Sequence, residues 1–256
     1  MHVLLASDGS AEANAAASLL IAGARRDTVS VTVLSVAALA GASPGWPPDY
    51  LKDAVAEDQE RAERTAQAVA ERLTQSGFRT TARTGKGHPG AEVLRELARE
   101  GTDLAVLGYG THRWLGSRLL GSTGSFVLQE APSSVLLAHT GPASLEQCRV
   151  LVATDGSPEA QAADSVLDGF LDPDRCMMEV VTASAMPPIW TAAIDSGLTA
   201  PYVGPTLSSD AFQELLQTER TNAEAIAGQS AHRLHAAGFR PEIQMVFGPV
   251  KSSLLR

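Results

Sequence analysis

The sequence repeats itself, which limits the chain to folds that can be built twice. The stretch from Val3 to Leu20 returns as Val150 to Leu167, a constant shift of 147 positions with 12 identities in 18 positions. A second block, from Ala70 to Arg79, aligns with Ala231 to Arg240 at a shift of 161. The difference between the shifts means that the second copy carries 14 additional residues between the two blocks. This pattern is typical of a tandem duplication.

The second copy is expected to be incomplete in this chain. Leu94-Arg95 matches Leu255-Arg256, and the first copy then continues for another 44 residues, through His139. The natural protein either ends at this point or continues in a tail. The repeat therefore predicts two domains of one fold, at residues 1–140 and 148–256, the second without its C-terminal part.

Composition and charge exclude several classes of protein. With 44% hydrophobic residues, each copy has enough apolar material for a core. The sequence contains no apolar run of the roughly 18 to 20 residues that span a bilayer, and its amino terminus lacks a secretory pattern. A net charge of −9 argues against a broad nucleic-acid surface, because phosphate backbones are held by clustered Lys and Arg. We therefore expect a cytoplasmic protein with neither a nucleic-acid nor a membrane partner.

The two cysteines of the chain give no sign of a metal site. Cys148 and Cys176 lie at non-equivalent places in the repeat, and their spacing is not that of metal ligands. We expect two free thiols in place of a disulfide, and no bound metal.

Short apolar runs alternate with helical patterns along the first copy. This alternation predicts an α/β fold with an open parallel sheet covered on both faces, built once in each copy. The segment from Ala37 to Tyr50 is rich in Gly and Pro and is expected to be a loop. The expected strands are His2–Ala6, Ser30–Val36, Phe78–Thr84, Leu104–Leu107 and Ser134–Ala138. The expected helices are Ala11–Ala24, Asp53–Ser76, Ala91–Glu100 and Ser122–Glu130.

Parallel sheets bind ligands beyond the carboxyl ends of their strands, where the winding direction switches. The residues at or just after such ends here are Asp8, Val36 and the segment from Gly108 to Ser122. That segment has no acidic residue, and it combines several glycines and basic side chains with a helix start at Gly121-Ser122, which favours phosphate. Its residues alone support equally a phosphate-binding loop and a glycine-rich turn with a solvated basic face.

These motifs resemble the universal stress protein family in its tandem form. The first strand ends in Asp8-Gly9-Ser10, and the later loop resembles the family signature G-x2-G-x9-G-[ST]. The outer spacing of the signature is kept, because Gly121 follows Gly108 by 13 residues. The inner signature position holds Thr111, and Gly110 stands one residue before it.

The resemblance implies a nucleotide site in the first copy. Asp8 would contact the adenine or ribose, the Val36 backbone would read the adenine, and the loop would follow the ribose and phosphates. From the residues alone, Asp8 can instead shape a turn, Val36 can belong to the core, and the basic side chains can be solvated. The expected set is Asp8, Val36, Gly108, Gly110, Thr111, His112, Arg113, Gly121 and Ser122.

The function that the resemblance implies is that of a stress-response protein which binds ATP, with or without Mg²⁺, and acts as a nucleotide-dependent regulator or binding module. Two alternatives stay open: a stress scaffold that binds no nucleotide, and a slow ATP-hydrolysing enzyme. No catalytic residue is assigned, because the sequence shows no carboxylate cluster for Mg²⁺, no poised general base and no P-loop. The resemblance also implies pairing through the final strand, Ser134 to Ala138, as a homodimer or as an intrachain pseudo-dimer.

Overall fold

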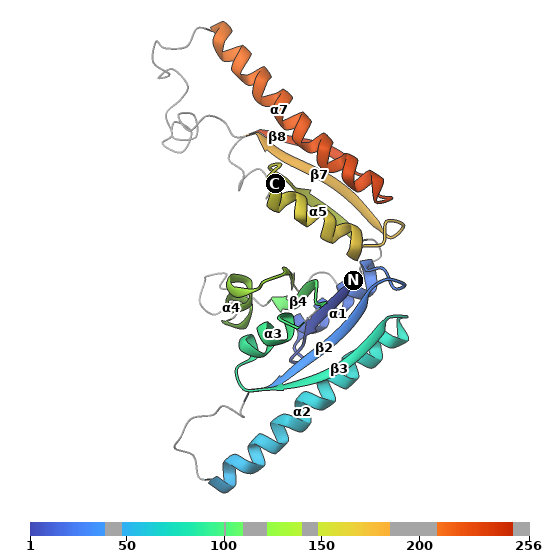
Figure 1. Ribbon diagram of the computed structural model, residues 1–256, viewed down its shortest axis with the longest axis vertical. Coiled ribbons are helices and arrows are strands. Elements are labelled where there is room, and N and C mark those ends of the chain that lie inside the picture. Colours follow the sequence, from blue (N-terminus) through green and yellow to red (C-terminus); the bar gives the residue numbers. More distant parts are fainter. Residues whose placement is uncertain (39–47, 100, 110–121, 140–147, 185–208, 248–256) are drawn as a thin grey trace. The chain divides into compact units, whose positions relative to one another are not determined.

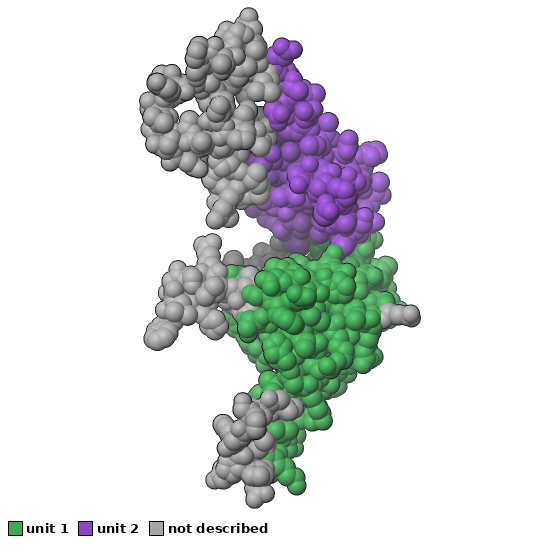
Figure 2. Space-filling model, turned by 60° about the vertical axis from the view of Figure 1, so that its left-hand side comes forward, with its two compact units in different colours: residues 1–146, 169–172 green, residues 147–168, 173–256 purple. Residues whose placement is uncertain are grey.

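The computed structural model describes residues 1–38, 48–99, 101–109, 122–139, 148–184 and 209–247 (Figure 1). The chain divides into two compact units (Figure 2). Unit 1 comprises residues 1–146 together with 169–172, and unit 2 comprises residues 147–168 and 173–256. No helix in the described ranges is long and apolar enough to cross a membrane.

Unit 1 is an α/β layer structure around one parallel sheet. The strand order is β3-β2-β1-β4-β5, and all four pairings are parallel, which confirms the predicted α/β class with five parallel strands in the first copy. Its strands are β1 (His2–Ala6), β2 (Ser30–Ala37), β3 (Arg79–Lys86), β4 (Leu104–Tyr109) and β5 (Ser134–His139). Its helices are α1 (Ala11–Gly23), α2 (Pro48–Gln75), α3 (Pro89–Leu97) and α4 (Ser122–Glu130).

The helices of unit 1 cover both faces of the sheet. α1 and α2 contact each other and pack on one face, and α3 and α4 contact each other on the opposite face (Figure 1). Successive residues of a strand point to opposite faces, so Leu4 joins Val93 of α3 and Val127 of α4 in one buried cluster. Burial on both faces is why Val3 to Ala6 of β1 and Leu104 to Leu107 of β4 are apolar without interruption.

Several element boundaries differ from the sequence-based expectation, and prolines explain two of them. α2 begins at Pro48, inside the segment that was predicted to be a loop, and α3 begins at Pro89, two residues earlier than predicted. Proline is well accepted at the first helical position, where its missing N–H is not needed. The His88 side chain caps α3 by accepting a hydrogen bond from the Ala91 N–H at 3.3 Å. β3 continues to Lys86 and β4 to Tyr109.

Unit 2 contains a smaller parallel sheet with the order β6-β7-β8. The order parallels β1-β2-β3, and α5 and α7 take the chain positions of α1 and α2. The extra residues of the second copy fall between β7 and α7, at 185–208, which lie outside the described residues. The elements are β6 (Cys148–Ala153), α5 (Pro158–Phe170), β7 (Cys176–Ser184), α7 (Ser209–Ala236) and β8 (Glu242–Phe247).

A buried polar network joins the two helices of unit 2. The carboxylate of Asp164 in α5, whose side chain is 2% exposed, accepts hydrogen bonds from Ser230 Oγ at 3.0 Å and from Arg233 Nη2 at 2.7 Å. The repeat places Ala17 and Val69 at the positions equivalent to Asp164 and Ser230. Both of those residues are buried in unit 1, so the same helix pair packs there with apolar side chains at these two positions.

Candidate functional site

A cavity of about 160 Å³ lies at the carboxyl ends of β1, β2 and β4 in unit 1. β1 stands between β2 and β4, and the chain winds outward from it in both directions, so the cavity lies at the switch point of the sheet. The three strand ends, the loop after β1 and the first turns of three helices build its wall. The lining residues are Ala6, Ser7, Asp8, Ser10, Ala13, Leu34, Val36, Pro89, Val93, Leu107, Gly108, Thr123 and Gly124.

The corner between β1 and α1 brings Asp8 to the cavity, the one ionisable side chain among the described lining residues. Asp8 is exposed, and its Oδ1 accepts a hydrogen bond from the Ser10 N–H at 2.9 Å. This hydrogen bond forms an Asx turn, which is one of the two roles that the sequence allows for Asp8. Among the described residues, Oδ2 of Asp8 accepts no hydrogen bond. Gly9 completes the corner at φ 81°, a conformation that glycine adopts readily. One carboxylate oxygen therefore shapes the turn while the other is available to a ligand.

Three helices begin at this cavity. Ser10 and Ala13 belong to the start of α1, Pro89 is the first residue of α3, and Thr123 and Gly124 lie in the first turn of α4. The first N–H groups of a helix lack partners inside the helix, and the helix dipole adds positive potential there. Ser10 Oγ accepts from the Ala13 N–H at 3.2 Å and so satisfies one of these groups in α1. The convergence favours an anionic or hydrogen-bond-accepting ligand.

Gly108 is required for the packing of α1 on β4 as well as for the approach of a ligand to the backbone. A Cβ atom placed on Gly108 would lie 2.4 Å from the carbonyl carbon of Glu12 and 2.5 Å from the Ala13 nitrogen. The first turn of α1 therefore rests directly on the end of β4. Glycine at this position lets the helix start approach the strand end, and this approach forms one wall of the cavity.

The structure brings three of the predicted site residues together. Asp8, Val36 and Gly108 line the same cavity, and Val36 is half-buried there. Ser122 is exposed at the first position of α4, directly before the lining residue Thr123. The other predicted residues lie outside the described residues: Gly110, Thr111, His112, Arg113 and Gly121.

The sequence-based reasoning missed the contribution of α3. Val93, 1% exposed, and Pro89 border the cavity from the face opposite α1. Gly85 to Gly90 match G-x-G-x-x-G, a dinucleotide pattern, but the segment begins in the last residues of β3, at the sheet edge, rather than after β1. The segment matters for the cavity because its last residues begin α3. The available signal was the His88-Pro89 pair, which marks a helix start after a strand.

The equivalent corner of unit 2 has the same turn but lacks the same surroundings. Ser157 N–H donates to Asp155 Oδ1 at 2.9 Å, and hydrogen bonds from Ser157 lower the pKa of Asp155 below its usual value. Gly156 has φ 78°, close to that of Gly9. Within the described part of unit 2, no strand or helix occupies the positions of β4, α3 and α4. The walls that enclose the unit 1 cavity are therefore not found around Asp155 in that part of the chain.

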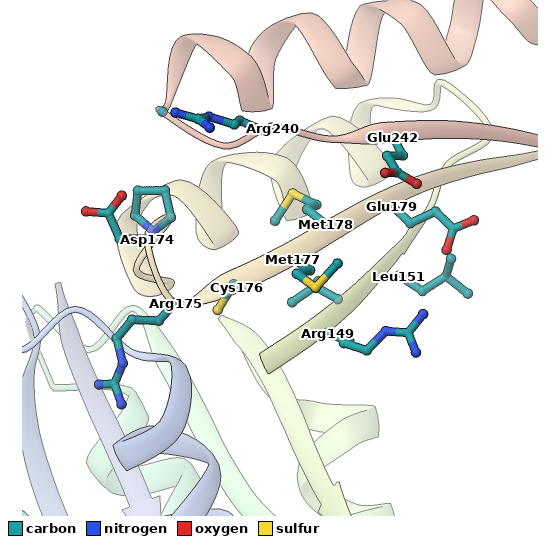
Figure 3. A pocket seen from close by; sticks show the side chains of 13 residues that line it. Arg149, Leu151, Asp174, Arg175, Cys176, Met177, Met178, Glu179, Arg240 and Glu242 are labelled. Carbon is teal, nitrogen blue, oxygen red and sulfur yellow. The ribbon is translucent and has the colours of Figure 1, made fainter. Parts of the chain in front are cut away.

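A larger hollow of about 790 Å³ lies on the sheet of unit 2 (Figure 3). Arg149, Leu151, Met177 and Glu179 line it, and Leu151 and Met177 are 50% and 55% exposed. The hollow also includes the residues just before β7 and β8, so it lies toward the amino ends of the strands. Ligands of parallel sheets bind at the carboxyl ends, so we favour the smaller cavity of unit 1 as the functional site.

Comparison with known proteins identifies the family. The model of the universal stress protein family matches residues 1–139, which is more than half of the 256 residues of the chain. The chain belongs to the universal stress protein family. The cavity described above lies wholly within the matched residues of this universal stress protein.

Solved structures share the universal stress protein fold. A universal stress protein from Archaeoglobus fulgidus DSM 4304 aligns over 99% of this chain and 81% of its own, with 17% identity and a TM-score of 0.56. The universal stress protein UspA from Lactobacillus plantarum aligns over 54% of this chain and 97% of its own, with 22% identity and a TM-score of 0.45. A family protein from Arabidopsis thaliana, solved with AMP bound, aligns over 56% and 93% respectively, with 17% identity and a TM-score of 0.40.

Proposed function

We propose that unit 1 binds an adenine nucleotide, with ATP as the expected ligand, and that the protein acts as a nucleotide-dependent binding module in the cytoplasmic stress response. The single observation that supports this most strongly is the cavity at the switch point between β1 and β4. We further propose that residues 1–140 and 148–256 are two domains of the universal stress protein kind, and that the first of them holds the nucleotide.

The chemistry of the cavity walls suits a nucleotide. Leu34, Val36 and Val93 supply an apolar wall for a base, and Asp8 can accept hydrogen bonds from a ribose or a base edge. The amino-terminal end of α4 borders the cavity, and the positive end of its dipole suits a phosphate. At about 160 Å³ the cavity is smaller than the several hundred Å³ of ordinary ligand pockets, so it accounts for only part of a nucleotide.

We propose that the phosphates extend toward Gly110, Thr111, His112, Arg113 and Gly121. The family structure from Arabidopsis thaliana is described with AMP and another universal stress protein with cAMP. Those two likenesses are too distant to assign a ligand here, with TM-scores of 0.40 and 0.38. The proposal for this chain therefore rests on its own cavity and its family.

Binding is a better proposal than catalysis at this site. Asp8 is the only ionisable side chain among the described residues that line the cavity. Phosphoryl transfer is catalysed mainly by positioned cations and by a residue that orients the nucleophile. A single exposed carboxylate beside helix starts can hold a nucleotide but offers little stabilisation to a transition state. If ATP is hydrolysed at all, we expect slow turnover, with Mg²⁺ arriving with the nucleotide.

The test compares equivalent aspartates of the two copies. We expect Asp8→Ala to weaken ATP binding roughly tenfold to a hundredfold, because a hydrogen bond to a charged group contributes about 1.5–3 kcal/mol. Asp8→Asn keeps an oxygen that can accept from the Ser10 N–H, so it separates the loss of charge from the loss of the turn. Asp155→Ala, which removes the same turn contact in unit 2, should leave binding unchanged. Isothermal titration calorimetry measures the ATP affinity of the original protein and of the three variants.

The scaffold alternative has a simple readout. Freshly purified protein, denatured and analysed by mass spectrometry, should release an adenine nucleotide. Absence of nucleotide in that analysis, together with no calorimetric heat for ATP, would favour a scaffold that binds none. Equal losses for Asp8→Ala and Asp155→Ala would instead contradict the assignment of the site to unit 1.

We also propose that the protein pairs through β5, as a homodimer or as an intrachain pseudo-dimer. β5 is the outer strand of its sheet, and no described strand covers its free edge, which presents unpaired backbone groups to a partner. In the homodimer case we expect sedimentation velocity to show a species of twice the single-chain mass of 26.7 kDa as concentration rises. A proline at Leu136 should weaken this association, because proline cannot donate to an intermolecular ladder. A species that stays at one chain mass throughout would rule out the homodimer.

A further inference from the structure

The fold brings the only two cysteines of the chain together. Cys148 and Cys176 are 28 positions apart in the sequence, and they pair directly with each other at the first residues of β6 and β7. Neighbouring strands lie about 4.8 Å apart, and disulfides join residues whose Cα atoms are about 4.4–6.8 Å apart. Neither cysteine forms a disulfide in the structure. Their backbone positions are therefore compatible with a disulfide.

The two thiols also share one face of the sheet. Alternation along β6 places Cys148 with Val150 and Val152, and alternation along β7 places Cys176 with Met178. Cys176 is buried at 8% exposure, while Cys148 is half-buried. The Cys148 thiol is therefore accessible to a small solute, whereas the Cys176 thiol is shielded from solvent.

The surroundings of Cys148 favour its reactive form. A hydrogen bond from the Cys176 side chain, opposed by burial and aided by the charge of Arg175, lowers the pKa of Cys148 to about 7. The thiolate is the nucleophilic form of cysteine, and it is substantially populated at neutral pH when the pKa is near 7.

The first copy shows that the fold does not need thiols at these positions. The shift of 147 places Met1 opposite Cys148 and Val29 opposite Cys176 in the alignment. The register agrees, because His2 pairs with Ser30 in unit 1 as Arg149 pairs with Met177 in unit 2. Val29 is fully buried. An apolar residue therefore suffices for packing, and the pair of thiols is an addition of unit 2.

We propose that Cys148 and Cys176 form a dithiol site that reacts with hydroperoxides and closes to an intrachain disulfide. The Cys148 thiolate attacks one oxygen of the peroxide, the O–O bond breaks, and the alkoxide or hydroxide that leaves takes up a proton. The resulting sulfenic acid is then attacked by the Cys176 sulfur, and water leaves with the Cys176 proton. For hydrogen peroxide, two thiols and one peroxide yield one disulfide and two waters. The two sulfurs supply the two electrons.

The disulfide would join β6 to β7 covalently. No described strand pairs with the other edge of β6, so β7 is its only strand neighbour in the described part of the chain. Cross-linking the first residues of both strands closes the β6-α5-β7 segment into a loop, which restricts its unfolded state. Oxidation should therefore slow amide exchange in β6. A dithiol reductant reverses the reaction. The site is separate from the nucleotide cavity and does not depend on it.

To test this proposal, the full chain is treated with hydrogen peroxide, and its peptides are mapped without reduction of disulfides. We expect one cross-linked peptide pair containing Cys148 and Cys176, a mass lower by two hydrogen atoms, and full recovery of both thiols with a dithiol. Under limiting iodoacetamide, Cys148 should be alkylated about tenfold faster than Cys176, because its thiolate fraction and exposure are greater. Disulfides between chains, or oxidation of both sulfurs without a cross-link, would overturn the proposal.

The matched variants come from the repeat. Cys176→Val and Cys148→Met introduce the residues that the first copy carries, so both variants should fold. In Cys176→Val we expect Cys148 to stop at sulfenic acid, which dimedone traps. In Cys148→Met we expect at least a tenfold lower rate of peroxide consumption than in the unmodified chain. Equal rates in Cys148→Met and the unmodified chain would show that Cys148 is not the attacking thiol.

Discussion

Gly108→Ala is expected to destabilise unit 1 and to abolish most of its nucleotide binding at once. The added Cβ would lie 2.4 Å from the Glu12 carbonyl carbon, which is backbone and cannot rotate away. The first turn of α1 must therefore move off the end of β4. We expect a loss of about 3 kcal/mol, the upper end for overpacking, because the clash is with main chain. Because Ser10 and Ala13 line the cavity, ATP affinity should fall at least about tenfold.

A matched control for this variant is Gly228→Ala in α7. A Cβ at Gly228 meets nothing within 4 Å, so the same chemical change has no steric cost there. Alanine is also the better helix former, and the control should gain about 0.5–1 kcal/mol. Hydrogen exchange followed by mass spectrometry distinguishes the two results. Peptides of α1 and β4 should lose protection in Gly108→Ala, whereas α7 peptides should gain it in Gly228→Ala. Unchanged protection of α1 in Gly108→Ala would contradict the packing role of this glycine.

Arg233→Met is expected to destabilise unit 2 strongly. The substitution leaves the Asp164 carboxylate, 2% exposed, with the Ser230 hydroxyl but without its cation. Removing one partner of a buried ion pair costs about 3–5 kcal/mol. Arg233 itself is 35% exposed, which reduces its contribution, so we expect a loss near 3 kcal/mol. Hydrogen exchange in α5 and α7 peptides measures the loss without interference from unit 1.

The repeat supplies the rescue for this variant. Asp164→Ala and Ser230→Val reproduce Ala17 and Val69 of unit 1, where the equivalent helices pack with apolar side chains at these two positions. Combined with Arg233→Met, they remove every member of the network at once. Replacing a buried ion pair by apolar residues is often neutral or stabilising, so the triple variant should return to within about 1 kcal/mol of the original protein. A triple variant as unstable as Arg233→Met alone would show that packing, and not the uncompensated charge, causes the loss.

The sequence of the first copy was sufficient to predict the order and type of its elements. Apolar runs such as Val3 to Ala6 and the alanine-rich stretch after Ser10 are local patterns, and local patterns set strand and helix preference. The alternation of the two predicted a parallel sheet, and a parallel sheet binds at its carboxyl edge. Asp8, Val36 and Gly108 could therefore be named together before any contact was known. Helix starts were less predictable, because Pro48 suits both a loop and a first turn.

Tertiary structure alone decided which residues meet. Gly108 was predicted as a ligand-approach residue, and its contact with Glu12 follows from how α1 crosses the end of β4. Val93 reaches the cavity because α3 covers the face opposite α1, which no local pattern encodes. Cys148 and Cys176 stand at non-equivalent places in the repeat, and nothing in their spacing relates them, yet the register of β6 and β7 sets them opposite each other. The periodicity of apolar residues along a chain indicates which side of a helix or strand is buried. Which residue of another element it then contacts depends on how the elements pack.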